Sequence, residues 1–353
     1  MREQQVVKSI GVRSIVALAM GCLLAGAGPA MAADYALLTS NRIGGPGGWD
    51  YLTVDAAGAR IYISRGDHVD VYDTAAGKVF GRVPGTSGVH GIALAEAHDR
   101  GYTSNGKANS VTVFELSTLR VIKEVAIAGQ NPDAILYEPV SDRVYTFNGK
   151  SKDVTVLDGS TYAVVATLPV PGKPEYAQTD GAGKVYVNIE SEPGQIVMID
   201  GKVPAVRATW TLAGCNSPTG LALDAAHHRL FSVCDDKVMA VTNALTGKQV
   251  ARVAIGEGPD AAAYDAALGL VFSSNGQDGT LSIVRQESAD RYVVQQTLGT
   301  ARGARTMALD AKSHRVYLVT ADFGMAPEPT ADVPHPRAPA VPDSFTVHVA
   351  GPR

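Results

Sequence analysis

The chain has 353 residues, 19% of them charged and 45% hydrophobic, with a formal net charge of −4. This acidic balance disfavours a nucleic-acid-binding protein, because such proteins usually carry a basic balance or a basic stripe. No stretch beyond the first 32 residues approaches the roughly 18 consecutive apolar residues that a membrane-spanning helix needs, so we expect no membrane span.

Residues 1–32 have the pattern of a secretory signal peptide. Basic residues, the last of them Arg13, precede a mostly apolar run at 15–24, and a small-x-small cleavage sequence ends at Ala32. We therefore expect cleavage after Ala32 and a periplasmic or secreted protein. Lipid attachment at Cys22 is the alternative, although the residues before Cys22 fit a lipoprotein box poorly.

Aromatic residues recur at a near-constant interval along the rest of the chain. Seven of them lie 40–45 residues apart, and a basic residue stands two positions before six of the seven. Four strand-like runs per unit at this period are typical of a β-propeller blade, as in WD40-like repeat proteins. The seven aromatic positions are Tyr62, Tyr102, Tyr145, Tyr186, Phe231, Phe272 and Tyr317.

The third unit illustrates the four runs, at 133–138, 143–148, 153–158 and 162–168. They are short, rich in β-formers and separated by turn residues such as Asn148-Gly149, and they show no 3.6-residue period. We predict an all-β fold, a seven-bladed β-propeller that occupies residues 33–353 as a single domain.

The seventh unit lacks its outer strand. It supplies runs at 306–310, 315–320 and 344–350, and the sequence then ends. A spare strand-like run at 35–41 precedes the first unit. We therefore predict that this N-terminal strand completes the last blade, which removes open sheet edges and ties the two termini together.

Four copies share a short core around the aromatic residue. They are Gly-Tyr-Thr-Ser-Asn-Gly at 101–106, Val-Tyr-Thr-Phe-Asn-Gly at 144–149, Val-Tyr-Val-Asn at 185–188 and Val-Phe-Ser-Ser-Asn-Gly at 271–276. These copies resemble the Tyr-Val-Thr-Asn core of the bacterial YVTN-type β-propeller repeat family, over essentially the whole chain after Ala32. The first, fifth and seventh copies depart from this core. The resemblance implies the propeller fold and says little about function.

Residues 321–343 interrupt the seventh unit with a proline-rich insertion. Such a segment is stiff and extended, and it is unable to join a sheet. A long irregular loop in a compact domain is either a functional lid or a disordered segment. The six prolines are Pro327, Pro329, Pro334, Pro336, Pro339 and Pro342.

Polar residues begin the innermost strand of each unit, so propeller topology places them around one mouth of the central channel. That face also carries the insertion. A wet mouth has polar residues without any function, but convergent polar groups are also the usual lining of a ligand pocket. Clustered carboxylates can in addition hold a divalent cation. The candidate ligand-binding residues are Asp50, His90, Asp133, Glu175, Asp260 and Arg305, and the fifth unit has Thr219 at this position.

Two cysteines remain after the signal peptide. Cys215 precedes the innermost strand of the fifth unit, and Cys234 ends the second strand of the same unit. Antiparallel pairing brings these two points together on one face, so we predict a structural disulfide in the exported protein. A metal site or a reactive thiol is the alternative, but no C-x-x-C motif or nearby His pair supports it.

The leading functional interpretation is a binding or scaffold protein that recognises a small ligand or a protein partner at the channel mouth. The alternative is a metal-dependent propeller hydrolase, lactonase or lyase, in which the ring carboxylates would hold a divalent cation and His90 would move a proton. Walker A, G-x-S-x-G, H-E-x-x-H and EF-hand motifs are absent, so no catalytic residue is assigned. We expect a monomer without a cofactor, unless that cation is bound.

Overall fold

The structure is a computed structural model that describes residue 1, residues 34–330, residue 336 and residues 338–353. The predicted signal peptide, its cleavage site and Cys22 lie outside the described residues, as do positions 331–335 and 337 of the insertion. Ala33–Arg353 form one compact unit. Among the described residues, no helix has the length and apolar character needed to cross a membrane.

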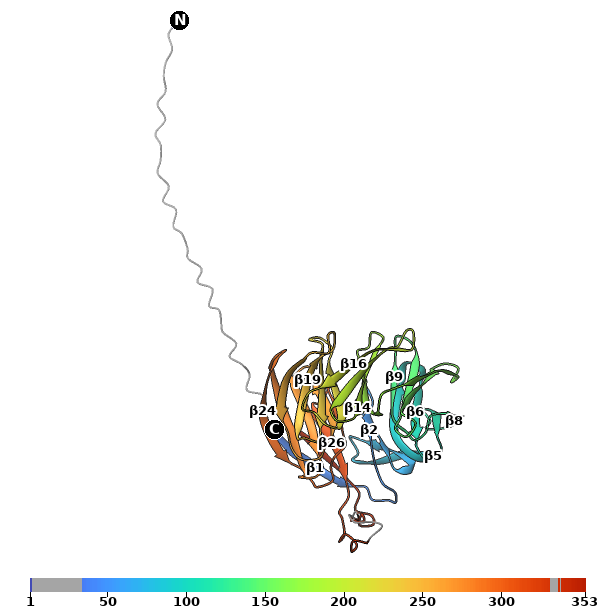
Figure 1. Cartoon of the computed structure of the whole chain (residues 1–353). Helices are drawn as coiled ribbons and strands as arrows, with labels where there is room; N and C mark the ends of the chain where they lie inside the picture. Colours follow the sequence, from blue (N-terminus) through green and yellow to red (C-terminus); the bar gives the residue numbers. More distant parts are fainter. Residues whose placement is uncertain (2–33, 331–335, 337) are drawn as a thin grey trace. The chain divides into compact units, whose positions relative to one another are not determined.

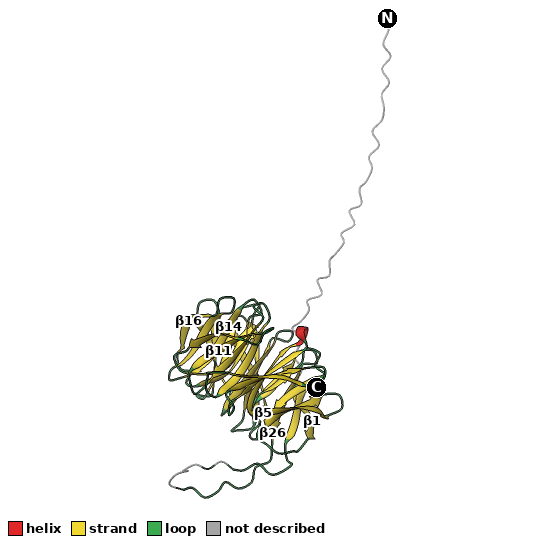
Figure 2. Cartoon of the chain, turned by 90° about the vertical axis from the view of Figure 1, so that its right-hand side faces the viewer, coloured by secondary structure: helices red, strands yellow, loops and turns green. Residues whose placement is uncertain are grey.

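The described part of the chain consists of antiparallel β-sheets (Figure 2), which confirms the all-β prediction. Its one helical element is a short 3₁₀ turn, η1 (Glu96–His98). Five sheets have four strands and one has seven. Middle strands are buried at nearly every position because neighbouring sheets cover both of their faces, whereas outer strands alternate between exposed and half-buried side chains.

Four sheets are built from consecutive strands. They comprise β9 (Pro132–Glu138), β10 (Arg143–Asn148), β11 (Asp153–Asp158) and β12 (Val164–Pro169); β13 (Lys173–Thr179), β14 (Lys184–Glu190), β15 (Gly194–Asp200) and β16 (Ala205–Leu212); β17 (Pro218–Asp224), β18 (Arg229–Cys234), β19 (Val238–Asn243) and β20 (Gln249–Ala254); and β21 (Pro259–Asp265), β22 (Leu270–Asn275), β23 (Thr280–Ser288) and β24 (Arg291–Gly299).

The seven-stranded sheet differs from the seven separate sheets that the sequence predicts. Its long strand β5 pairs with β4 mainly through 78–84 and with β6 through 89–95, so no break separates two groups of strands. In order, the sheet contains β2 (Leu52–Val54), β3 (Arg60–Ser64), β4 (Gly66–Asp73), β5 (Lys78–Ala95), β6 (Arg100–Asn105), β7 (Ser110–Glu115) and β8 (Val121–Ala126).

The innermost strands form a closed ring. Each of β2, β5, β9, β13, β17 and β21 contacts the next, and β21 contacts β25 (Met307–Asp310), which contacts β2. This ring surrounds the central channel and brings the starts of all its strands to one mouth.

The N-terminal strand completes the C-terminal sheet, as predicted. β1 (Tyr35–Arg42) pairs antiparallel with β27 (Thr346–Pro352), and the sheet continues through β26 (Arg315–Thr320) to β25. Tyr35 is fully buried, packs on Phe272 with 5.2 Å between ring centroids, and donates a hydrogen bond to the carbonyl of His314 at 2.9 Å. β1 therefore joins the last sheet to its neighbour as well as to its own strands.

The recurrent aromatic residues are buried packing anchors. Tyr145 is fully buried and donates from its hydroxyl to the carbonyl of Gly201 at 3.3 Å, and Tyr102 donates likewise to Gly159 at 2.8 Å. Each acceptor lies in the next sheet along the chain. The aromatic repeat therefore fixes one sheet against the next, because a buried phenol requires a hydrogen-bond partner.

Cys215 and Cys234 form the predicted disulfide, with 5.4 Å between their Cα atoms, and both are fully buried. The bond ties the loop before β17 to the end of β18. This position lies at the same end of the sheet as the channel mouth, because β17 begins there.

Candidate functional site

The structure places the predicted ring residues where the innermost strands begin, and ion pairs join most of them. Asp133 and Asp260 are the second residues of β9 and β21, and Glu175 is the third residue of β13. Asp50 and Arg305 lie just before β2 and β25. The repeat spacing explains this convergence, since each copy delivers one side chain to the same level of the channel.

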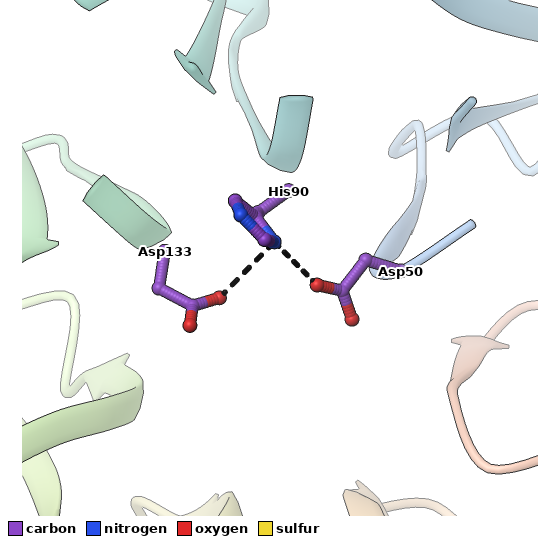
Figure 3. A group of neighbouring side chains, drawn as sticks. All are labelled: Asp50, His90 and Asp133. Atoms are coloured by element: carbon purple, nitrogen blue, oxygen red, sulfur yellow. Dashed lines mark hydrogen bonds and ion pairs between the residues drawn. The ribbon is translucent and has the colours of Figure 1, made fainter. Parts of the chain in front are cut away.

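His90 lies between two carboxylates (Figure 3). Its Nδ1 is 2.6 Å from Asp50 Oδ2 and 3.7 Å from Asp133 Oδ1. Burial alone would lower the pKa of His90, but the hydrogen bond that its Nδ1 donates to Asp50 and the charges of both carboxylates raise it above its usual value. The imidazole therefore supplies a positive charge to this side of the ring.

Arg305 forms the second cationic bridge of the ring. Its Nη2 lies 3.3 Å from Asp50 Oδ1, and its Nε lies 2.7 Å from Asp260 Oδ2. Burial raises the pKa of Asp260 to about 7, although Arg305 opposes that shift. Asp50 is thus held between His90 and Arg305, one on each carboxylate oxygen.

Lys173 forms the third bridge, and the sequence did not single it out. Its Nζ lies 2.8 Å from Glu175 Oε2 and 2.8 Å from Glu190 Oε2. Burial, followed by the charge of Asp133, raises the pKa of Glu175 well above its usual range. A signal for Lys173 was available, because it precedes Glu175 by two residues and so lies at the same end of the strand.

Two tyrosines contact each other next to the ring residues. The centroids of Tyr51 and Tyr176 are 5.2 Å apart, and Tyr51 donates a hydrogen bond to Glu175 at 3.2 Å. Tyr51 directly precedes β2, and Tyr176 lies in β13. The neighbours of β2 in the ring are β5 and β25, so the contact between the two tyrosines crosses the channel. The sequence held a signal here too: the other copies have small residues at this position, Gly91, Ala134, Gly220, Ala261 and Thr306.

Thr219 does not join the ion-pair network. Its hydroxyl donates to the carbonyl of Pro259 at 3.0 Å, which links β17 to β21. Thr219 nevertheless contributes to the lining of the pocket at the mouth.

A pocket of about 540 Å³ opens at the mouth. Carboxylates and aromatic rings share its lining, and the ring centroids of Trp49 and Phe323 are 6.1 Å apart. Asp235, on the rim, forms no ion pair with the described residues. Burial and the charge of Glu190 raise its pKa. The main lining residues are Trp49, Glu190, Thr219, Asp235, Asp260 and Phe323.

The ends of the insertion form a narrow neck beside this pocket. Phe323 and Ala340 form an isolated β-bridge, and the amide of Gly324 donates to the carbonyl of Pro339 at 2.9 Å. This isolated bridge lies outside the sheets, and Pro339 contributes only its carbonyl to the neck. Beyond the neck, the described part of the insertion extends away from the sheets (Figures 1 and 2).

A second pocket, of about 930 Å³, continues the first under the neck. Both pockets share Gln277, Arg305 and Phe323, and the second extends outward to Arg302 and His348. The two pockets together form one open, elongated depression at the mouth.

Known proteins support the fold at a coarse level. No family model matches the chain, and no curated protein matches it. The chain is similar to a solved chain of Kuenenia stuttgartiensis hydrazine synthase, with 15% identity over 78% of this chain and 93% of that chain and a TM-score of 0.69.

WD40-type structures match to a similar degree. A structure of the RRP9 WD40 repeats is 11% identical, with 91% of this chain and 99% of that chain covered and a TM-score of 0.72. A chain in the mitotic checkpoint complex is 13% identical, with 87% and 95% covered and a TM-score of 0.71. These likenesses show a β-propeller, WD40-like fold. At such identities they carry no activity over to this chain.

Asp260→Asn is expected to weaken the pH dependence of folding stability. The folded-state pKa of Asp260 is about 7, and an unperturbed Asp titrates near 3.9. Between those values the folded chain binds more protons than the unfolded chain, so stability falls as the pH rises from about 4 to about 7. Urea unfolding from pH 4 to pH 8 should show a loss that is smaller in the variant by about 2–4 kcal/mol.

Asp236→Asn is the matched control, because this exposed carboxylate lies outside the ring and bonds Asn216. Its pH profile should equal that of the unmodified chain. An Asp260→Asn profile that loses as much stability with rising pH as the unmodified chain contradicts the prediction.

Proposed function

We propose that this chain is a non-enzymatic binding protein that holds a small organic cation in the pocket at the channel mouth. The observation that carries the proposal is the pairing of an unpaired carboxylate, Asp235, with two aromatic side chains in a pocket of about 540 Å³. That volume falls within the range of small-molecule sites.

Charge at the mouth favours a positively charged ligand. Carboxyl groups outnumber basic side chains at the mouth by six to three, although the raised pKa values of Glu175 and Asp260 leave those two partly protonated near neutral pH. The carboxylates are Asp50, Asp133, Glu175, Glu190, Asp235 and Asp260, and the basic residues are His90, Lys173 and Arg305.

The aromatic residues favour an ammonium group over a simple polar ligand. A cation within about 6 Å of an indole or phenyl face is stabilised by the ring quadrupole, most strongly for Trp. Trp49 is fixed by Phe345, with 5.2 Å between centroids, and Phe323 is fixed by the neck. The lining of the pocket therefore combines two packed aromatic rings with a carboxylate that forms no ion pair among the described residues.

Calorimetric titration with choline and with spermidine tests the proposal. At least one of these probes is expected to bind, and Asp235→Asn should weaken that binding tenfold or more, because it removes the one unpaired carboxylate of the pocket. Asp236→Asn is the control and should bind as the unmodified chain does. Absence of binding by both probes, or equal binding by Asp235→Asn, overturns the proposal.

The ion pairs of the ring give less support to the metal-dependent hydrolase alternative, in which four ring carboxylates would hold the cation. Glu175 and Asp260, two of these four carboxylates, are engaged by Lys173 and Arg305. The solved structures of similar fold include WD40 repeats and a chain within a multi-protein complex, which agrees with a binding role.

We also infer seven blades, an exported monomer and a YVTN-type repeat. The inner ring of seven strands supports the count, with β5 supplying the outer strand of one blade and the inner strand of the next. The disulfide supports an oxidising compartment. Mass spectrometry of the exported protein tests the cleavage site: a mature chain that begins at Ala33 is expected, and retention of residues 1–32 contradicts it.

A further inference from the structure

We propose a binding site for one divalent transition-metal ion at the mouth, with Asp50 Oδ2, His90 Nδ1 and Asp133 Oδ1 as its protein ligands. This cluster lies apart from the organic-cation pocket, whose lining includes none of the three residues. Figure 3 shows both carboxylates directed at the imidazole from opposite sides.

The three side chains already have nearly the spacing that one ion requires. One ligand atom from each lies within 4.8 Å of the others. Ligand atoms about 2.0–2.2 Å from a tetrahedral ion lie roughly 3.3–3.6 Å apart. The 3.7 Å contact of His90 with Asp133 is close to that spacing. The 2.6 Å contact with Asp50 has to open by under about 1 Å, and His90 Nδ1 releases its proton when the ion binds. The ligands come from three different parts of the inner ring, and packing fixes their backbones.

Asp133 is weakly engaged, because its one ion pair among the described residues is the long contact with His90. This residue is only 8% exposed, yet its carboxylate accepts no hydrogen bond from any described residue. Its closest basic atom is His90 Nδ1, at 3.7 Å, which is beyond hydrogen-bonding distance. Buried carboxylates normally accept hydrogen bonds or coordinate a metal. The oxygen that faces His90 therefore has an unused lone pair aimed into the cluster.

The other ring carboxylates serve as a contrast. Asp260 is bonded by Arg305 at 2.7 Å, and Glu175 is bonded by Lys173 at 2.8 Å. Arg305 also holds Asp50 Oδ1 at 3.3 Å, which leaves Asp50 Oδ2 directed at the cluster. An outer partner of this kind orients a ligating carboxylate.

The donor set selects the class of metal. One imidazole nitrogen with two carboxylate oxygens suits Zn²⁺, Mn²⁺ or Fe²⁺, whereas Ca²⁺ and Mg²⁺ prefer oxygen alone. Three protein ligands would leave at least one coordination position free for water or another ligand.

Zinc titration of the chelator-treated protein tests the site. We expect one Zn²⁺ per chain by calorimetry and by elemental analysis, and at least tenfold weaker binding by Asp133→Asn and by His90→Gln. Glu175→Gln is the matched control, because it removes another buried ring carboxylate, and its Zn²⁺ affinity should stay within about threefold. Circular dichroism and thermal unfolding establish that each variant is folded.

Two outcomes overturn the site: no stoichiometric Zn²⁺ in the unmodified protein, or Asp133→Asn and His90→Gln that bind Zn²⁺ as tightly as it does. Asp235→Asn separates this site from the proposed function. That variant should lose choline or spermidine binding and keep its Zn²⁺, so either proposal can fail while the other stands.

Discussion

A chain that lacks residues 34–42 is expected to lose its cooperative fold. The deletion removes β1, and with it the edge strand of the C-terminal sheet and the fully buried Tyr35. Loss of a large buried aromatic side chain alone costs about 3–5 kcal/mol, against a typical total stability of about 5–15 kcal/mol. Urea unfolding followed by circular dichroism should show no folded baseline, or a midpoint far below that of the unmodified chain.

Point variants on the same strand give a graded control. Tyr35→Ala should destabilise by about 3–5 kcal/mol, because it leaves a cavity beside Phe272. Leu38→Ala, at a side chain that is 41% exposed, should cost below about 1 kcal/mol. Equal effects of the two variants, or a deletion that folds normally, would show that β1 does not close the ring.

Removal of the disulfide is expected to produce the second large loss of stability. Cys215 and Cys234 are both fully buried, and the bond closes a sequence separation of 19 residues. In the chain-entropy model, a disulfide that closes a loop of about this length adds about 3 kcal/mol to the free energy of unfolding. Loss of a native disulfide from a small secreted domain typically costs about 2–5 kcal/mol. The double variant Cys215→Ala, Cys234→Ala should therefore unfold at a clearly lower urea concentration.

Reduction of the unmodified protein supplies the control for that experiment. Dithiothreitol should lower its unfolding midpoint towards that of the double variant, and it should leave the double variant unchanged. A reduced protein as stable as the oxidised one would contradict a structural role for the bond.

Repetition in the sequence explains why the ring residues were predictable. Asp50, His90, Asp133 and Asp260 each precede the buried aromatic residue of their copy by 12 residues, and Glu175 precedes its own by 11. The period therefore puts Asp133 and Asp260 at one mouth. The same argument placed Cys215 beside Cys234 and β1 beside β27. All of these follow from pairing within one sheet or from position within one repeat.

Features that depend on contacts between distant sheets were not predictable in this way. The contact between Tyr51 and Tyr176 crosses the channel. The repeat period gives no information about distances across the channel. Trp49 and Phe323 lie in segments outside the regular strands, so no repeat position marked them. The continuity of β5 was not predicted either. The strand passes through Gly85 and Gly88 with positive φ angles of 74° and 71°, which are more typical of turns.

The fluorescence of Trp49 is the most direct test of ligand binding at the mouth. The chain has two tryptophans, and Trp210 lies in β16, away from the pocket, so a Trp210→Phe variant reports on Trp49 alone. Titration of this variant with choline and with spermidine should give a saturable change in emission for at least one probe, and Asp235→Asn should abolish it. Calorimetric binding without any change in Trp49 emission would contradict a ligand site at the channel mouth.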